Sequence, residues 1–306
     1  MRRLALLLLL AVLVAAGARP AASQGFDLAR GGDTQIQIYA DNGIEWRSDQ
    51  NRVIARGNAK AVRGTMTVTA DTLTAYYRGS AAGGGNEIWR VDAEGNVTIA
   101  TPTDTATGVK ATYDLDKAIF VLRGQPAKLT TPTQTFTADD ALEYWENEKM
   151  AVLRGNGLAI QKDKKIQADV LTAHFKDKGP PAPGKGAPAK GGGNAGGSLD
   201  LHHADGFGHV VLTTATEVVT GDRGDYNMES GIATVSGSVK ITRGGNELNG
   251  GYAHVDLNSG ISKLFGAAPG ATGDQRVRGT FVPDRSGDEK RQPMFRGNVP
   301  QGKAAE

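Results

Sequence analysis

The chain contains no cysteine, so neither disulfides nor thiolate-bound metal ions hold it together. Aromatic residues make up only 6% of the sequence, and any buried surface must therefore be built mainly from aliphatic and small side chains. No window carries the sustained apolar stripe of an amphipathic helix. Instead, 42 glycines and 12 prolines interrupt short runs rich in threonine and valine, which is typical of an all-β protein.

The charges of the chain are almost balanced, with a formal net charge of +2, which argues against a general nucleic-acid-binding protein. Glycines that cradle a phosphate precede a helix, whereas the glycines of this chain precede strand-like alternation, so nucleotide binding is not expected. No serine, histidine and aspartate arrangement of a hydrolase stands out. We therefore expect a protein that is not an enzyme and that uses no cofactor.

The stretch from Val53 to Tyr77 is the unit from which most of the chain is built. Apolar and polar residues alternate along it with the period of two that is typical of a strand covered on one face. The apolar positions run from Met66 to Ala70 and resume at Leu73 only if one residue is skipped. Such a slip predicts a β-bulge or a corner, where a sheet bends around its contents.

The same spacing recurs along the chain, because a glycine is followed 12 or 13 residues later by a short motif of small residues, often with aspartate. These glycines are Gly57, Gly95, Gly124, Gly155, Gly208 and Gly237. A single strand pair cannot bury its own apolar face, so repeats of about thirty residues must stack on one another. The sequence therefore predicts an all-β stack of strand pairs.

Aspartates occupy one phase of this repeat. The neighbouring Asp139 and Asp140 suggest a pair of carboxylates for acid and base catalysis. However, Asp71, Asp139 and Asp169 stand at equivalent positions of successive repeats. Side chains that recur in register are typical of turn-shaping residues, and we interpret these aspartates in that way.

The N-terminus predicts a secretory signal at residues 1–23. Two arginines precede the apolar run Leu4–Ala16, and the small residues Ala21-Ala22-Ser23 follow it. A signal anchor that stays uncleaved is the alternative. The remaining predicted segments are the main repeats at 24–176, a linker rich in Gly, Pro, Ala and Lys at 177–198, further repeats at 199–265 and a disordered tail at 266–306. The further repeats either complete the first sheet or pack as a separate module.

Histidines gather near the end of the predicted linker. His202, His203 and His209 would need a further ligand, such as Asp200 or Asp205, to hold a metal ion. The same residues are also typical of a solvated loop that enters a strand. We favour that second interpretation and predict no metal.

The interior of the predicted stack suggests a ligand. Bent strand pairs without enough bulky aromatic residues leave an apolar lumen, and such lumina in β-structures hold apolar molecules. Each methylene removed from water contributes about 0.8 kcal/mol, so an acyl chain of about a dozen carbons gains on the order of 10 kcal/mol at most. The alternative is that the apolar faces close on each other as a solid core.

The order of short motifs resembles the OstA-like domain of the LptA family of periplasmic lipopolysaccharide-transport proteins. The resemblance covers residues 35–175 with good spacing and is weaker over residues 205–264. It implies a V-shaped, folded β-jelly roll in the periplasm whose open interior shields the acyl chains of lipopolysaccharide. The motifs are Ile36-x-Ile38-x-Ala40-Asp41, Glu45, Gly57-Asn58 and Thr69-Ala70-Asp71-x-Leu73, repeated later as Gly155-Asn156 and Ile166-x-Ala168-Asp169.

The resemblance also implies partners and site residues. Edge strands would dock head to tail, either with further copies or with an LptC-like component of an inner-membrane export complex and an LptD-like outer-membrane translocon. Rim residues such as Lys60 and Arg63 would meet sugar phosphates. The predicted lipid-binding groove consists of Met66, Val68, Leu73, Phe136, Ile166, Leu171 and Phe175. The predicted partner edges are Ile36 and Ile38 at one end, and Val255 and Leu257 at the other.

Two other functions stay open. A structural or scaffolding β-protein of the envelope would have a closed core and bind protein partners only through its edge strands. A metal-dependent hydrolase would retain a metal ion through His202, His203 and His209. Within the transport pathway, the linker, the additional repeats and the long tail leave open a bridge component, a relative of membrane-anchored LptC or a separate binding protein of the same fold.

Overall fold

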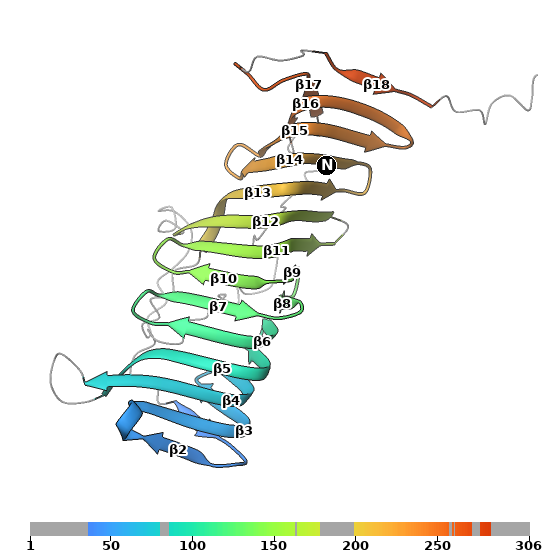
Figure 1. Ribbon diagram of the computed structural model, residues 1–306. Coiled ribbons are helices and arrows are strands. Elements are labelled where there is room, and N and C mark those ends of the chain that lie inside the picture. Colours follow the sequence, from blue (N-terminus) through green and yellow to red (C-terminus); the bar gives the residue numbers. More distant parts are fainter. Residues whose placement is uncertain are drawn as a thin grey trace, which may run out of the picture.

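The protein is a tall stack of antiparallel strands, in which strands close in the sequence lie side by side (Figure 1). This computed structural model describes residues 36–79, 86–162, 164–177, 199–256, 259, 261–270 and 276–282. Its strands form one 18-stranded sheet, which confirms the predicted all-β, repetitive jelly roll. The signal predicted at residues 1–23 lies outside the described residues. Among the described residues, no helix is long and apolar enough to cross a membrane.

The strands as far as the predicted linker are β1 (Gln37–Tyr39), β2 (Ile44–Arg47), β3 (Arg52–Arg63), β4 (Met66–Gly79), β5 (Asn86–Ala100), β6 (Thr105–Asp114), β7 (Ile119–Arg123), β8 (Ala127–Thr130), β9 (Thr135–Ala138), β10 (Ala141–Trp145), β11 (Met150–Gln161) and β12 (Lys164–Asp177). Those beyond it are β13 (Leu199–Thr213), β14 (Val218–Asn227), β15 (Ile232–Arg243), β16 (Asn246–Asp256), β17 (Ile261–Phe265) and β18 (Arg278–Thr280). One short 3-10 turn, η1 (Ser48–Gln50), connects β2 to β3.

Each long strand bends once and contributes to two walls. In β3, residues 52–55 pair with β2, whereas residues 60–62 pair with β1. We call the half of the sheet that contains residues 52–55 wall A and the half that contains residues 60–62 wall B. In the middle of the stack the bend is a complete break: β7 and β8 both pair with β6, and β9 and β10 both pair with β11.

A β-bulge forms the corner where two unbroken long strands pair across it. The pairing of β3 with β4 shifts so that Gly57 and Asn58 together face Asp71 alone, the two-against-one arrangement of a bulge. Both bulge residues are left-handed, with φ of 75° at Gly57 and 43° at Asn58, a region that glycine and asparagine tolerate best. The slip that the sequence predicted at Ala70 and Asp71 is therefore confirmed.

The recurring aspartates hold these corners together. At the corner between β4 and β5, the Asn96 Nδ2 donates a hydrogen bond to the Asp71 carboxylate at 3.0 Å. The same contact recurs from Asn58 to Asp41 at 2.7 Å and from Asn156 to Asp139 at 2.8 Å. The interpretation of Asp71 and Asp139 as turn-shaping residues is confirmed, because each is engaged at its own corner.

The apolar faces of the two walls meet inside the stack. Along β4, Met66, Val68 and Ala70 are buried in wall B, and burial resumes at Leu73 in wall A after the corner. These side chains belong to a single apolar cluster that draws on strands from β3 to β16. Because the alternation slips by one residue at the corner, the apolar side chains of one strand point into the stack from both walls.

The repeats beyond the predicted linker continue the first sheet. β13 pairs with β12 from Thr213 opposite Lys165 to Leu199 opposite Asp177. Of the two arrangements that the sequence left open, the structure shows the single sheet. Residues 178–198, which hold nearly all of the predicted linker, lie outside the described residues.

Part of the predicted disordered tail is ordered, which corrects the expectation for residues 266–306. Within that segment, β18 pairs with Glu247–Asn249 of β16. β17 pairs with residues 252–256 of β16. The backbone groups in the first half of β16 therefore need another partner, and β18 supplies it.

The corners predict a specific cost for a side chain at their glycines. A Cβ atom on Gly95, where φ is +75°, would lie 2.1 Å from the Asp71 Oδ2. We expect Gly95→Ala to lower the free energy of unfolding by about 1–3 kcal/mol, measured by urea denaturation followed by circular dichroism. Gly79→Ala is the matched control, because a Cβ atom there meets nothing within 4 Å. Equal stability of the two variants would contradict this account of the corner.

Candidate functional site

An apolar cavity of about 370 Å³ lies between the walls at the N-terminal end of the stack. This volume falls within the range of roughly 300–1,000 Å³ that is typical of ligand sites. Both walls contribute to it: Val68 and Ile99 come from wall B, and Leu73 and Ala93 come from wall A. The lining residues are Ile36, Ile38, Val53, Ala55, Ala61, Arg63, Val68, Leu73, Thr74, Ala75, Asn86, Ile88, Val91, Ala93, Ile99, Ala111, Tyr113, Leu115 and Phe120.

Small residues at inward positions leave this space. Ala55, Ala61, Ala75 and Ala93 line the cavity at positions where the strand period turns the side chain inward. An alanine side chain extends only one methyl group from the sheet, so the walls enclose a volume that they do not fill. Toward the middle of the stack, Phe120 also lines the cavity and is only 2% exposed.

The structure divides the predicted groove residues between an open and a packed part. Val68 and Leu73 line the cavity. Met66, Phe136 and Leu171 belong to the same buried apolar cluster as these two residues but are not among those that line the cavity. The half-buried Ile166 and Phe175 pack against that cluster. The alternative of a solid core therefore describes the middle of the stack, while the N-terminal end is open.

Near the strands beyond the linker, the interior contains a smaller space. Ile166, Val210, Leu212 and Tyr226 line a cavity of about 40 Å³. Burial raises the pKa of the Tyr226 hydroxyl, which keeps this group uncharged at neutral pH. This second space is large enough for a few methyl groups but not for an acyl chain.

Sequence reasoning missed several cavity residues that a fuller use of the repeat would have found. Ile99 and Ala111 lie on β5 and β6 at inward positions that alternate along the strand as Val68 and Leu73 do on β4. The signal was the alternation of inward and outward positions along each strand, which is the same from one repeat to the next. The predicted groove residues were instead mostly large apolar side chains, and large side chains fill an interior space rather than leave it open.

The N-terminal edge adjoins the cavity. Among the described strands, β1 pairs only with β3, so the backbone groups along its other side have no strand partner there. Ile36 and Ile38, the predicted edge residues, are 45% and 37% exposed and also line the cavity. The exposed Ile44 and Trp46 lie on β2, which pairs with β3 in wall A, so both walls end in exposed apolar side chains.

The structure corrects the other predicted edge. Val255 is 3% exposed and lies in β16, paired with Ala233 of β15 on one side and Ser262 of β17 on the other. It is therefore inside the sheet rather than at its end, because β17 covers this arm of β16. Leu257 lies outside the described residues. Of the predicted rim residues, Lys60 is exposed on β3, and Arg63 lines the cavity.

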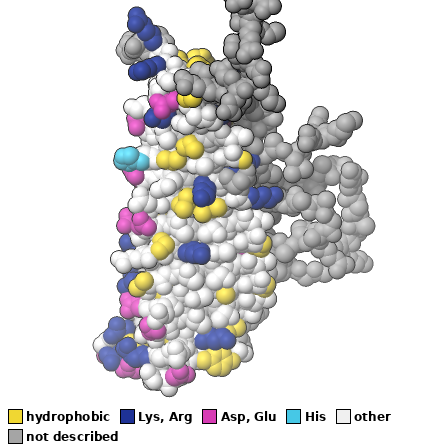
Figure 2. Space-filling model, turned by 90° about the vertical axis from the view of Figure 1, so that its right-hand side faces the viewer, with side chains coloured by type: hydrophobic (Ala, Val, Ile, Leu, Met, Phe, Trp, Pro, Cys, Tyr) yellow, Lys and Arg dark blue, Asp and Glu magenta, His cyan; other side chains and the backbone are white. Residues whose placement is uncertain are grey.

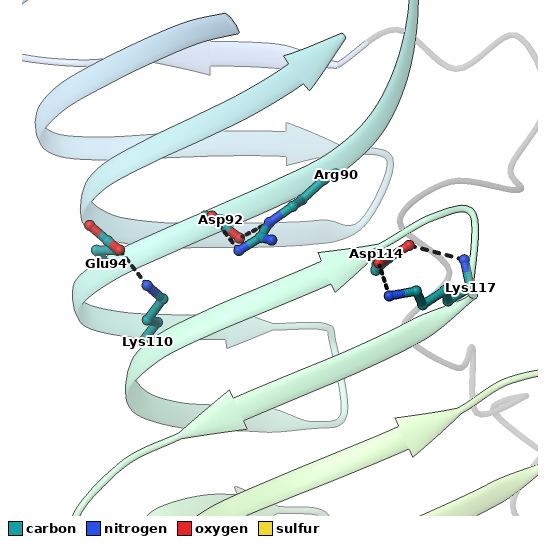
Figure 3. Close-up of polar contacts among 6 residues, drawn as sticks. All are labelled: Arg90, Asp92, Glu94, Lys110, Asp114 and Lys117. Atoms are coloured by element: carbon teal, nitrogen blue, oxygen red, sulfur yellow. Dashed lines mark hydrogen bonds and ion pairs between the residues drawn. The ribbon is translucent and has the colours of Figure 1, made fainter. Parts of the chain in front are cut away.

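The outer surface is polar. On the face that Figure 2 shows, charged side chains of both signs follow one margin of the stack, and hydrophobic side chains lie in small separate patches. Figure 3 shows how charges pair on the outer face of wall A. Arg90 donates to both carboxylate oxygens of Asp92, at 2.9 and 3.0 Å, and Lys110 donates to Glu94 at 2.7 Å.

These pairs neutralise charge along the wall. The hydrogen bond from Arg90 to Asp92 raises the pKa of the Arg90 guanidinium, and the hydrogen bond from Lys110 to Glu94 raises the pKa of the Lys110 amine. Lys117 lies within 3.4 Å of Asp114 at the next turn (Figure 3). The paired charges leave the interior, rather than this face, as the place for an apolar ligand.

The three histidines considered as metal ligands are not brought together, which corrects that alternative. His209 is a bulge residue whose side chain is 90% exposed, and its Nδ1 lies 2.9 Å from the Asp169 carboxylate at a corner. His202 lies 3.7 Å from Glu229. His203 contacts Asp205, one of the further ligands considered, at 3.2 Å. Asp200, the other further ligand considered, lies in β13, and the structure describes only its backbone.

The fold and the cavity define a class of protein, the β-jelly rolls with an apolar interior that opens at one end. The sequence model of a family described as LptA/(LptD N-terminal domain) LPS transport protein matches residues 37–144 and again residues 135–261. These matches span most of the chain, and the chain therefore belongs to this family of lipopolysaccharide (LPS) transport proteins, as its motifs predicted.

Two individual proteins are also similar to this chain. An uncharacterised protein of Rhizobium meliloti (strain 1021) is 30% identical over 131 residues, which cover 42% of this chain and 69% of the relative. The crystal structure of LptH, described as the LptA homologous periplasmic component of the lipopolysaccharide transport device from Pseudomonas aeruginosa, is 12% identical. That match covers 82% of this chain and 96% of LptH, with a TM-score of 0.21.

The corner histidine predicts a pH-dependent stability. The hydrogen bond and the charge of Asp169 raise the pKa of His209 above its ordinary value of 6.5. A raised pKa stabilises the fold fully below the unfolded-state value, and this stabilisation is lost as the pH rises through the folded-state value. We expect a nuclear magnetic resonance titration to place the His209 midpoint above 6.5.

The matched control is His209→Asn, because asparagine occupies this position at three other corners and makes the same contact. Relative to this variant, the wild-type protein should be more stable at about pH 5.5 than at about pH 8.5 in urea unfolding. An offset between the two proteins that does not change with pH would contradict the assignment.

Proposed function

We propose that this protein carries lipopolysaccharide between the inner and the outer membrane and shields its acyl chains between walls A and B. The observation that carries the proposal is the apolar cavity of about 370 Å³, whose lining comes from both walls and reaches the edge strand β1. Membership of an LPS transport family supports the choice of lipid. The proposed role needs no chemical step.

Burial of methylene groups supplies the binding free energy. Each methylene contributes about 0.8 kcal/mol when it leaves water, so even a half-inserted acyl chain would gain several kcal/mol. The cavity offers this surface at Val68, Leu73 and Ile99, among side chains that are already ordered by the sheet. Arg63 on its lining places a cation near the region where a lipid phosphate would lie.

The position of the cavity supports a bridging role in the periplasm. An edge strand with unpaired backbone groups invites strand addition by another molecule. Ile36 and Ile38 lie both on this edge and on the cavity lining. A partner that adds its own strand there, either a second copy or an LptC-like or LptD-like component, would extend the cavity without a gap exposed to water.

A scaffolding role is the second candidate, and the packed middle of the stack is the observation that favours it. Phe136 and Leu171 are each 3% exposed, so neither is accessible to a lipid while these side chains keep their positions. A scaffold would use the same edge strands but leave the N-terminal cavity without a lipid. The occupancy of the cavity therefore distinguishes the two functions.

Photocrosslinking tests the occupancy directly. A photoreactive residue at Leu73, which lines the cavity, should form adducts with lipopolysaccharide in cells. The control is Thr67, which lies next to the inward-facing Val68 on β4 and therefore points to the opposite face of wall B. Adducts read by immunoblotting at Leu73 and not at Thr67 are expected. Their absence at Leu73 would favour the scaffold.

Filling the cavity tests the same proposal by another route. Ala75 lines the cavity and is half-buried, so Ala75→Phe should place its ring in the open volume. We expect at least a tenfold weaker affinity for purified lipopolysaccharide, because a ring that occupies the site excludes about two methylenes or more. Thr67→Phe, with the same ring outside, should bind as the wild-type protein does. Unchanged affinity of Ala75→Phe would show that lipid binds elsewhere.

A further inference from the structure

Four side chains that bind metals in other proteins converge on the outer face of wall A, away from the cavity. They come from three neighbouring strands: His174 from β12, His203 and Asp205 from β13, and Asp225 from β14. The donor atoms of His203, Asp205 and Asp225 all lie within 4.8 Å of one another, and His174 lies beside this group. The register places His174 directly opposite His203, and Asp205 directly opposite Asp225. The sequence separates these residues by up to 51 positions, from His174 to Asp225, and the sheet brings them together.

The distances among the donor atoms fit one small cation. The His203 Nε2 lies 3.0 Å from the Asp225 Oδ2 and 3.2 Å from the Asp205 Oδ2, and the His174 Nε2 lies 3.7 Å from the same Asp205 oxygen. Ligands at 2.0–2.2 Å in a tetrahedral arrangement are separated by roughly 3.3–3.6 Å. The three contacts bracket this separation, so His203, Asp205 and Asp225 could surround one ion after small side-chain movements. The His174 ring centre lies 5.9 Å from that of His203, and a rotation of the His174 side chain would bring a fourth donor to the same ion.

The charges of the cluster also favour a cation. Asp205 and Asp225 are directly opposite each other on adjacent strands, where like charges destabilise a sheet. Asp205 is the less exposed of the two, at 13% against 39%, which makes its charge costlier to leave unpaired. Arg223 offers only a distant contact, at 4.0 Å from the other oxygen of Asp205. The oxygen that faces the histidines therefore has a positively charged partner only when a histidine is protonated.

We propose that His174, His203, Asp205 and Asp225 bind a divalent transition-metal ion of the zinc type. Two imidazole nitrogens and two carboxylate oxygens suit zinc, whereas magnesium and calcium prefer oxygen ligands alone. The ion would join β12 to β13 and β14, where the chain resumes after residues 178–198. Its role is a clamp across this junction, independent of the apolar cavity.

Zinc binding to the full-length protein without a histidine tag tests the proposal. We expect isothermal titration with zinc chloride to show about one ion per chain, and zinc to raise the melting temperature of the protein. Excess magnesium should not compete. His203→Ala should weaken zinc binding by more than about 100-fold, because loss of a ligand exceeds the effect of losing an outer-shell partner.

Two variants keep the test decisive. Asp225→Asn removes one charged ligand from a half-exposed position and should also lose zinc binding and zinc-induced stabilisation, even if His203→Ala fails to fold. His209→Asn, at the distant corner, should bind zinc as the wild-type protein does. Absence of zinc binding by the wild-type protein, retained binding by Asp225→Asn, or loss of binding by His209→Asn would each overturn the proposal.

Discussion

The whole architecture depends on how a strand turns a corner without reversing its two faces. In a regular strand the side chains alternate strictly, so a bend alone would not return the apolar positions to the inside. The two-against-one bulge, with Gly57 and Asn58 opposite Asp71, supplies the missing residue. The aspartate on one strand and the amide on the next then hold the corner at a fixed place. Both walls can therefore bury apolar side chains from the same strand.

This constraint explains why so much of the fold could be predicted from the sequence. The alternation, the slip after Ala70 and the recurring Gly-Asn and Ala-Asp pairs are all local, and each belongs to a single strand or turn. How far the sheet continues beyond the linker could not be predicted from such local patterns. Its continuation from β12 to β13, and the pairing of β18 within the expected tail, depend on backbone groups of strands that the sequence does not place side by side.

The candidate site was predicted less completely, for a related physical reason. Leu73 and Phe136 occupy comparable inward positions, yet one lines the open cavity and the other is packed in the middle. What separates them is the size of the neighbouring side chains: several alanines line the cavity beside Leu73, whereas Phe136 does not line it and lies in a buried cluster with large, fully buried side chains such as Leu122. Packing across two walls depends on pairs of strands, and a single sequence shows only one strand at a time.

Because strands that follow one another in the sequence pair with each other, the height of the stack depends on the number of strands. Adjacent strands lie about 4.8 Å apart, so every additional strand pair lengthens the stack by roughly 10 Å. Each corner depends only on the two strands that it joins, so duplication or deletion of one unit leaves the other corners unchanged. The length of such a stack can therefore change during evolution in discrete increments of one strand pair.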